Sequence, residues 1–99
     1  AFLVNASLDK PCGELKDEES GDSVHLYSDR DTWVVYSMGG IPEDIYPARD
    51  KGKMAKESEA LALEAQFLPD AINHDGFGDI VLPANTEKTY TIAFEYHKG

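Results

Sequence analysis

Apolar and polar residues alternate most regularly near the C-terminal end of the chain. From position 89 to position 96 the even-numbered residues are large and apolar: Tyr90, Ile92, Phe94 and Tyr96. The residues between them are small or polar. A period of two is typical of a β-strand with one covered face. We therefore expect a strand here, with its even-numbered face buried.

The same pattern predicts strands elsewhere. Residues 2–8 and 23–28 alternate, and residues 80–82 form a short apolar run. Residues 32–38 are apolar and β-branched or aromatic on both faces, which favours a central strand covered on both sides. Because Asp29-Arg30-Asp31 is a compact turn, segments 23–28 and 32–38 predict a β-hairpin. The acidic stretch 14–22 and the stretch 39–52, which is rich in Pro and Gly, are expected to be loops.

Residues 53–68 give two signals. They contain no Gly, Pro or β-branched residue and many good helix formers, which favours a helix over about 53–60. However, Leu61, Leu63, Ala65 and Phe67 alternate with Ala62, Glu64 and Gln66, as in a strand. For the segment 53–67 a helix and a strand therefore both stay open.

Five or six strands with at most one helix predict a mainly β fold in a single domain, residues 1–99. The form that we favour is a small two-layer antiparallel β-sandwich of immunoglobulin-like type. The alternative is an α+β layer in which a helix over 53–67 packs on one antiparallel sheet.

The net charge of the chain excludes some classes of binding partner. The chain has 19 acidic against 9 basic residues, a net charge of −10. Such a field repels phosphate backbones and anionic lipids, so no nucleic-acid partner is expected. No apolar run reaches the roughly 18–20 residues that span a bilayer, so no transmembrane segment is expected.

The N-terminal region suggests a location. The chain begins with Ala1 and not Met, which indicates a removed leader or an excised fragment. Asn5-Ala6-Ser7 is an N-glycosylation sequon. Cys12, the one cysteine, excludes an internal disulfide. We expect a secreted or extracytoplasmic protein.

The loop over residues 70–79 is acidic and punctuated by Gly76 and Gly78. Alternating oxygen-bearing side chains followed by a glycine suit a hard cation. The loop resembles the D-x-N-x-D-G-x-x-D loops of calcium-binding repeats such as the integrin-type FG-GAP blades. That resemblance implies Ca²⁺ as the cofactor, with the ligands Asn73, Asp75, the carbonyl of Phe77, and Asp79. Ala71 stands at the first ligand position of that motif, and a plain polar turn would use the same residue types. A protein without any cofactor therefore stays the alternative.

The functional residues point to binding and not to catalysis. No nucleophile lies beside a base, and His25, His74 and His97 are scattered. We therefore expect no enzyme. The leading hypothesis is a secreted or surface-exposed binding protein, of the small toxin, adhesin or inhibitor type. It would engage a protein or glycan through loops 39–52 and 70–79, with Tyr46, Arg49 and His74 as contacts.

Two alternatives stay open. One is an acidic inhibitor or immunity-type protein that covers a basic partner, with binding that weakens as salt rises. The other is a structural coat or decoration subunit. The oligomeric state is left open by the sequence.

Overall fold

The computed structural model describes all of residues 1–99. Its residues divide into two compact units. One unit contains residues 1–33 and 65–99, and the other contains residues 34–64. A single domain over 1–99 stays a prediction.

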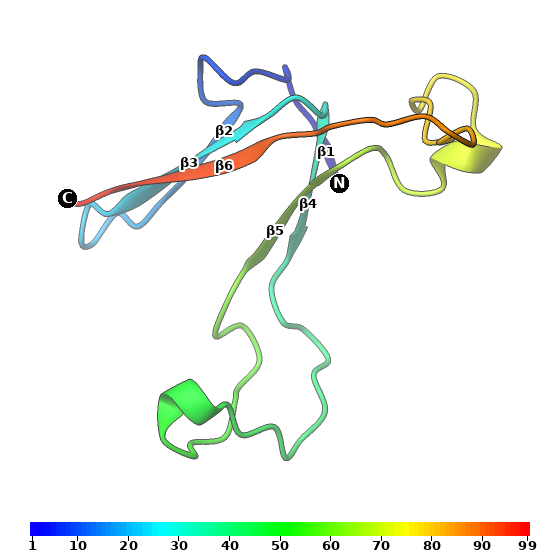
Figure 1. Ribbon diagram of the computed structural model, residues 1–99. Helices are drawn as coiled ribbons and strands as arrows, with labels where there is room; N and C mark the ends of the chain where they lie inside the picture. The colour runs from blue at the N-terminus through cyan, green and yellow to red at the C-terminus, as the bar shows by residue number, and fades with distance from the viewer. The chain divides into compact units, whose positions relative to one another are not determined.

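The chain forms two three-stranded sheets and almost no helix (Figure 1). The strands are β1 (Phe2–Leu3), β2 (Gly13–Lys16), β3 (Ser23–Ser28), β4 (Thr32–Tyr36), β5 (Ala62–Gln66) and β6 (Ile92–His97). Two 3₁₀ turns complete the set, η1 (Ala48–Asp50) and η2 (Ala71–Asn73). The strand orders are β1-β4-β5 and β2-β3-β6, so the prediction of a mainly β fold with two antiparallel sheets is confirmed. The immunoglobulin-like type stays a prediction. None of the helices has the length and apolar character needed to cross a bilayer.

The predicted hairpin between residues 23–28 and 32–38 is wrong. Both strands form, but β3 pairs with β2 and β6, while β4 pairs with β1. A tight hairpin favours Gly or Asn in its turn, and Asp29-Arg30-Asp31 contains neither. The turn therefore carries the chain from one sheet to the other, with Ser28 and Thr32 fully buried at its two ends.

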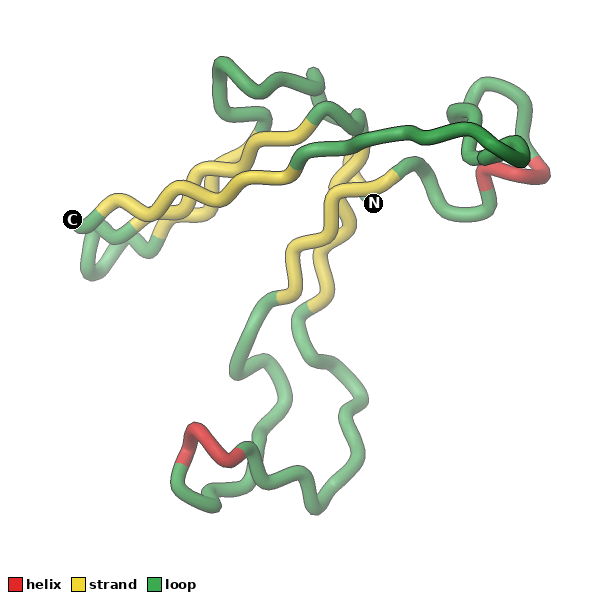
Figure 2. Tube along the Cα trace, in the orientation of Figure 1, coloured by secondary structure: helices red, strands yellow, loops and turns green.

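Several element boundaries differ from the sequence prediction. β2 occupies part of the stretch expected to be a loop, because β3 offers it a paired edge. The N-terminal strand is limited to β1, with one further bridge between Ser7 and Ser28. Residues 80–82 form no strand and lie in the long connection between η2 and β6 (Figure 2).

The segment 53–67 forms a strand at its end and no helix. β5 covers Ala62–Gln66, and residues 57–59 form turns with Ser58 in the left-handed region at φ 60°. Helix propensity is a weak preference that needs an apolar face packed against another element. The alternation of residues 61–67 was the better guide.

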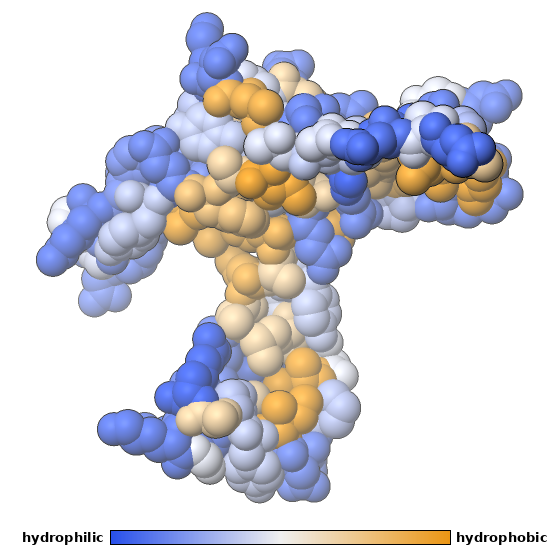
Figure 3. Space-filling view, in the orientation of Figure 1, coloured by the Kyte–Doolittle hydropathy of each residue, from blue (hydrophilic) through white to orange (hydrophobic).

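The expected burial of the β6 face is wrong, although the strand itself is present. Ile92, Phe94 and Tyr96 are 45%, 53% and 61% exposed. The Trp33 ring packs edge-on against Phe94 and the Phe67 ring against Tyr90, each at 5.7 Å between centroids, but Tyr90 too is 37% exposed. The alternation predicted the side of the strand that is apolar, but burial requires a second layer over that side. Figure 3 shows hydrophobic residues at the surface of the molecule.

The core is correspondingly small. Leu26 of β3 and Trp33 of β4 are 6% and 2% exposed, and the other buried apolar residues are alanines. β4 is the central strand of its sheet, as predicted. It is covered only at Thr32 and Trp33, because Val35 and Tyr36 are exposed.

Candidate functional site

A groove of about 560 Å³ lies beside the segment that follows β5. Its walls combine apolar, aromatic and charged side chains, among them Arg30, Gln66, Phe67, Asp70, Lys88 and Tyr90. Concave sites of this mixed character are typical of small-molecule binding.

Arg30 organises the groove. Its guanidinium carbon lies 4.2 Å from the Tyr90 ring centroid and 5.9 Å from that of Phe67, and the two rings meet edge to face at 5.7 Å. Arg30 Nη1 donates a hydrogen bond of 3.2 Å to the carbonyl of Ala65. Cation–π contacts and this bond hold the guanidinium in place. Its Nε is buried without a hydrogen-bond partner, which leaves one donor free beside the groove.

The candidate calcium ligands take part in local contacts. Asn73 Nδ2 donates to Asp70 Oδ1 at 2.6 Å, and the backbone N–H of Val81 donates to Asp79 Oδ1 at 3.0 Å. Asp79 also faces Lys88 at 3.8 Å. Asp75 forms no side-chain hydrogen bond or ion pair. Calcium binding by Asn73, Asp75, the Phe77 carbonyl and Asp79 stays a prediction.

The three candidate binding-loop residues lie in different units. Tyr46 is exposed, and Arg49 in η1 pairs with Asp50 at 3.4 Å, both within residues 34–64. His74 belongs to the other unit, where it contacts Asp70 Oδ2 at 3.1 Å and stacks on Phe77. A role in binding for these residues stays a prediction.

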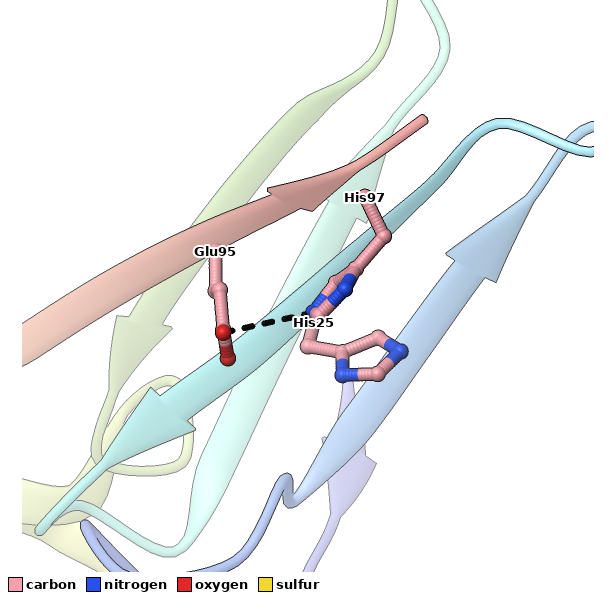
Figure 4. A group of neighbouring side chains, drawn as sticks. All are labelled: His25, Glu95 and His97. Carbon is pink, nitrogen blue, oxygen red and sulfur yellow. Dashed lines mark ion pairs between the residues drawn. The ribbon is translucent and has the colours of Figure 1, made fainter. Parts of the chain in front are cut away.

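The β2-β3-β6 sheet brings together a cluster that the sequence analysis missed. The antiparallel register places His25 directly opposite Glu95, and His97 follows on the same face of β6 (Figure 4). Glu95 Oε1 lies 3.4 Å from His97 Nε2, and the His25 and His97 rings are 4.2 Å apart. The two histidines appeared scattered because strand register cannot be obtained from spacing along the chain.

Tyr27 fixes the carboxylate of this cluster. Its hydroxyl donates a hydrogen bond of 2.6 Å to Glu95 Oε2. This bond, with smaller contributions from His97 and His25, lowers the pKa of Glu95. The same bond raises the pKa of Tyr27, because losing the phenolic proton would remove the donor.

Three strands carry a glutamate, and only one of these carboxylates lacks a partner. Glu95 accepts the bond from Tyr27, and Glu14 of β2 lies 3.8 Å from His25 Nε2. Glu64 of β5 is exposed between the less exposed Leu63 and Ala65 and forms no hydrogen bond or ion pair. A rigid strand that presents a carboxylate with no structural partner is a candidate for chemistry. Glu64 has no distinguishing signal in the sequence, because one acid in an apolar strand resembles an ordinary solvent-facing residue.

The chain belongs to the aldose 1-epimerase family, whose match covers residues 1–95. No solved structure matches the chain.

Two curated relatives agree with this assignment. An aldose 1-epimerase of Streptococcus thermophilus is 54% identical over 82 residues, which cover 83% of this chain and 24% of that protein. A maltose epimerase of Levilactobacillus brevis is 41% identical over 96 residues, which cover 97% of this chain and 26% of that protein. The chain therefore spans about a quarter of the length of these relatives.

Family membership corrects the functional hypotheses. The prediction of a non-enzymatic toxin, adhesin or inhibitor is wrong, and so are the immunity-type and coat-subunit alternatives. The expectation of no enzyme, which rested on the lack of a nucleophile beside a base, is also wrong, because the matching family and both relatives are epimerases. A protein partner is not supported. A secreted or extracytoplasmic location stays a prediction.

Proposed function

We propose that this protein interconverts the α and β anomers of a free aldose. The observation that carries the proposal is the 54% identity to an aldose 1-epimerase, together with the family match over residues 1–95. Because the chain spans about a quarter of its relatives, the proposal concerns the activity of the intact protein.

Exchange of anomers is a proton-transfer reaction. A base removes the proton of the anomeric hydroxyl, the carbonyl forms, and the bond between C1 and the ring oxygen breaks. An acid protonates the ring oxygen that leaves C1. The ring then closes on the opposite face of the carbonyl, with the two protons returned. One base and one acid, held at the two oxygens, are sufficient.

Glu64 is the residue of this chain that we assign to the base. It is exposed, it lies on a strand, and its carboxylate is not engaged by any neighbour. The other strand carboxylates, Glu14 and Glu95, face His25 and Tyr27. Glu64 alone among the three has neither a hydrogen bond nor an ion pair, so both of its oxygens are available to accept a proton.

The groove around Arg30 supports the binding of a sugar. Ring faces such as those of Phe67 and Tyr90 suit the apolar C–H face of a pyranose, while Arg30, Asp70 and Lys88 supply hydrogen-bonding groups for its hydroxyls. The sequence predicted a glycan as a possible partner. We propose instead that a free sugar is the substrate.

A disaccharide is the second candidate substrate. The relative that aligns with 97% of this chain is a maltose epimerase. Maltose has a free reducing end, so the same proton transfers apply to it. Rates measured with D-glucose and with maltose decide between the two, through the ratio of their kcat/KM values.

The test is the rate of anomer exchange, followed by the change in optical rotation of freshly dissolved sugar. We expect the intact protein to accelerate the change. Glu64→Gln keeps the shape of the side chain and removes the base, so kcat should fall about 10²–10⁴-fold.

Glu87→Gln is the matched control, since Glu87 is also exposed and without a side-chain partner but lies in a loop. It should leave kcat unchanged. An active protein whose rate is unaffected by Glu64→Gln would contradict the assignment of the base, whereas an inactive wild-type protein would contradict the function itself.

A further inference from the structure

The polar face of the β2-β3-β6 sheet carries a group of side chains that the proposed epimerisation does not use. His25, Glu95 and His97 each offer one ligand atom, and these atoms all lie within 4.8 Å of one another (Figure 4). No other three His, Cys, Asp or Glu residues of the chain converge in this way.

The spacing suits one ion held by three ligands. Tetrahedral Zn²⁺ has ligand bonds of about 2.0–2.2 Å, which places neighbouring ligand atoms roughly 3.3–3.5 Å apart. Glu95 Oε1 and His97 Nε2 already lie 3.4 Å apart. Small rotations of exposed or half-exposed side chains bring the remaining atom into range.

Strand pairing holds the three ligands in position. His25 and Glu95 are directly opposite each other in the register of β3 and β6, and His97 is the next residue of β6 on that face. Residues placed in this way on paired strands are neighbours whatever their distance along the chain.

Neighbouring groups orient the ligands. The Tyr27 hydroxyl binds Glu95 Oε2, which leaves Oε1 free to face the histidines. Glu14 Oε1 lies 3.8 Å from His25 Nε2 and adds negative charge beside the cluster. Such outer contacts fix ligand orientation and raise affinity in metal sites.

We propose that His25, Glu95 and His97 form a binding site for a divalent late first-row transition-metal ion of the Zn²⁺ type. Two imidazoles and one carboxylate suit Zn²⁺ and its neighbours. They do not suit Ca²⁺ or Mg²⁺, which take oxygen ligands. The site differs from the calcium loop at residues 70–79 in both its ligands and its ion. The net charge of −10 favours the approach of any cation.

The experiment is isothermal titration of the intact metal-free protein with ZnCl₂ in a buffer that does not chelate metals. We expect one equivalent to bind at this site. Imidazole ¹H–¹⁵N spectra of the same samples should show shifts of the His25 and His97 signals and none of His74.

Variants separate this site from weak surface binding. His25→Gln and His97→Gln should each lower the affinity at least about 100-fold, and Tyr27→Phe about 10-fold, as expected for a residue that orients a ligand. His74→Gln is the control, because His74 is an exposed histidine that pairs with a carboxylate outside the cluster. It should leave the affinity unchanged.

Circular dichroism shows whether each variant is folded. Absence of zinc binding by the folded wild-type protein would overturn the proposal. So would an affinity that is the same in His25→Gln, His97→Gln and His74→Gln, since the zinc would then bind elsewhere.

Discussion

The polar face of the β2-β3-β6 sheet and the loop at residues 70–79 both carry several possible ligand groups, but only the sheet brings three of them together. His25 and Glu95 lie far apart in the sequence and opposite each other in the structure. Asn73 and Asp79 lie close in the sequence and contact different neighbours, Asp70 in one case and Val81 with Lys88 in the other.

The difference shows what strand pairing does that a loop does not. A polar side chain in a loop finds its partner in the nearest backbone or side-chain group, as Asp79 does. A side chain on a strand is held perpendicular to the sheet, out of reach of its own backbone, so its neighbours are set by register. Convergence of distant residues is therefore the stronger sign of a site.

The largest expected effect tests whether the sheet and the connection that leads to β6 contribute differently to stability. Leu26 of β3 is 6% exposed, and Leu82 in the connection to β6 is 58% exposed. Leu26→Ala should lower the free energy of unfolding by about 2–5 kcal/mol, through lost burial and the cavity left behind. Leu82→Ala should change it by less than about 0.5 kcal/mol. Urea unfolding of both variants checks this, and equal losses would show that the connection is packed as tightly as the sheet.

A second pair of variants compares a closely packed glycine of the loop with a glycine that has open space around it. Gly78 has φ +103°, and a Cβ there would lie 2.6 Å from Cδ1 of the Phe67 ring. Gly76 has φ +85° and open space around it. Gly76→Ala should cost about 1 kcal/mol from backbone strain, and Gly78→Ala about 2–3 kcal/mol, because the Phe67 ring must also move. Thermal unfolding compares them, and a larger loss in Gly76→Ala would contradict this packing.

A smaller effect follows from the bond between Tyr27 and Glu95. The contribution of this bond to the free energy of unfolding is complete above the unfolded-chain pKa of glutamate, about 4.3. It is lost as the pH falls through the lower folded pKa of Glu95. The pKa of Tyr27 is raised, so the contribution is also lost as the pH rises above about 10 through that folded value.

The stability difference between wild type and Tyr27→Phe should therefore be greatest near neutral pH and shrink toward both extremes. Urea midpoints measured at pH 3, 7 and 11 follow it. A difference that does not change with pH would mean that the bond is absent in solution.

The smallest expected effect concerns calcium at the loop. Asn73 and Asp79 already have other partners, so we propose at most weak binding. Millimolar CaCl₂ should raise the melting temperature only slightly compared with a chelator, and Asp75→Ala should remove that small shift. A large shift that Asp75→Ala abolishes would mean that the loop rearranges around the ion, and would place a second ligand cluster beside that of the sheet.

Local patterns predicted much of the secondary structure. The segment 23–28 is a strand with the predicted bounds, and the strands at 32–36 and 92–97 lie within or close to the predicted ones. The helix predicted over 53–60 does not form, because the helix propensity of these residues is not supported by a packing partner. β2 was missed because its residues look like a solvated loop until β3 is placed beside them.

The candidate site was harder to predict. Arg30 appeared only as part of a turn, and its contacts with Tyr90 and Phe67 come from distant parts of the chain. Glu64 carried no sequence signal, since its distinguishing feature is the absence of a partner. The residues of the loop at 70–79 stood out because they are contiguous in the sequence. Contiguity does not show whether their oxygen atoms converge on one point.

The sequence by itself determined that the chain is acidic and mainly β, and which side of each strand is apolar, because charge and the period of two are local properties. The tertiary structure decided which strands pair and in which register, and therefore that β3 and β4 belong to different sheets. It also decided that the apolar face of β6 is exposed and that His25 meets Glu95 and His97. These outcomes depend on contacts between segments far apart in the chain. The free energy of such contacts is not determined by the residues of any one segment.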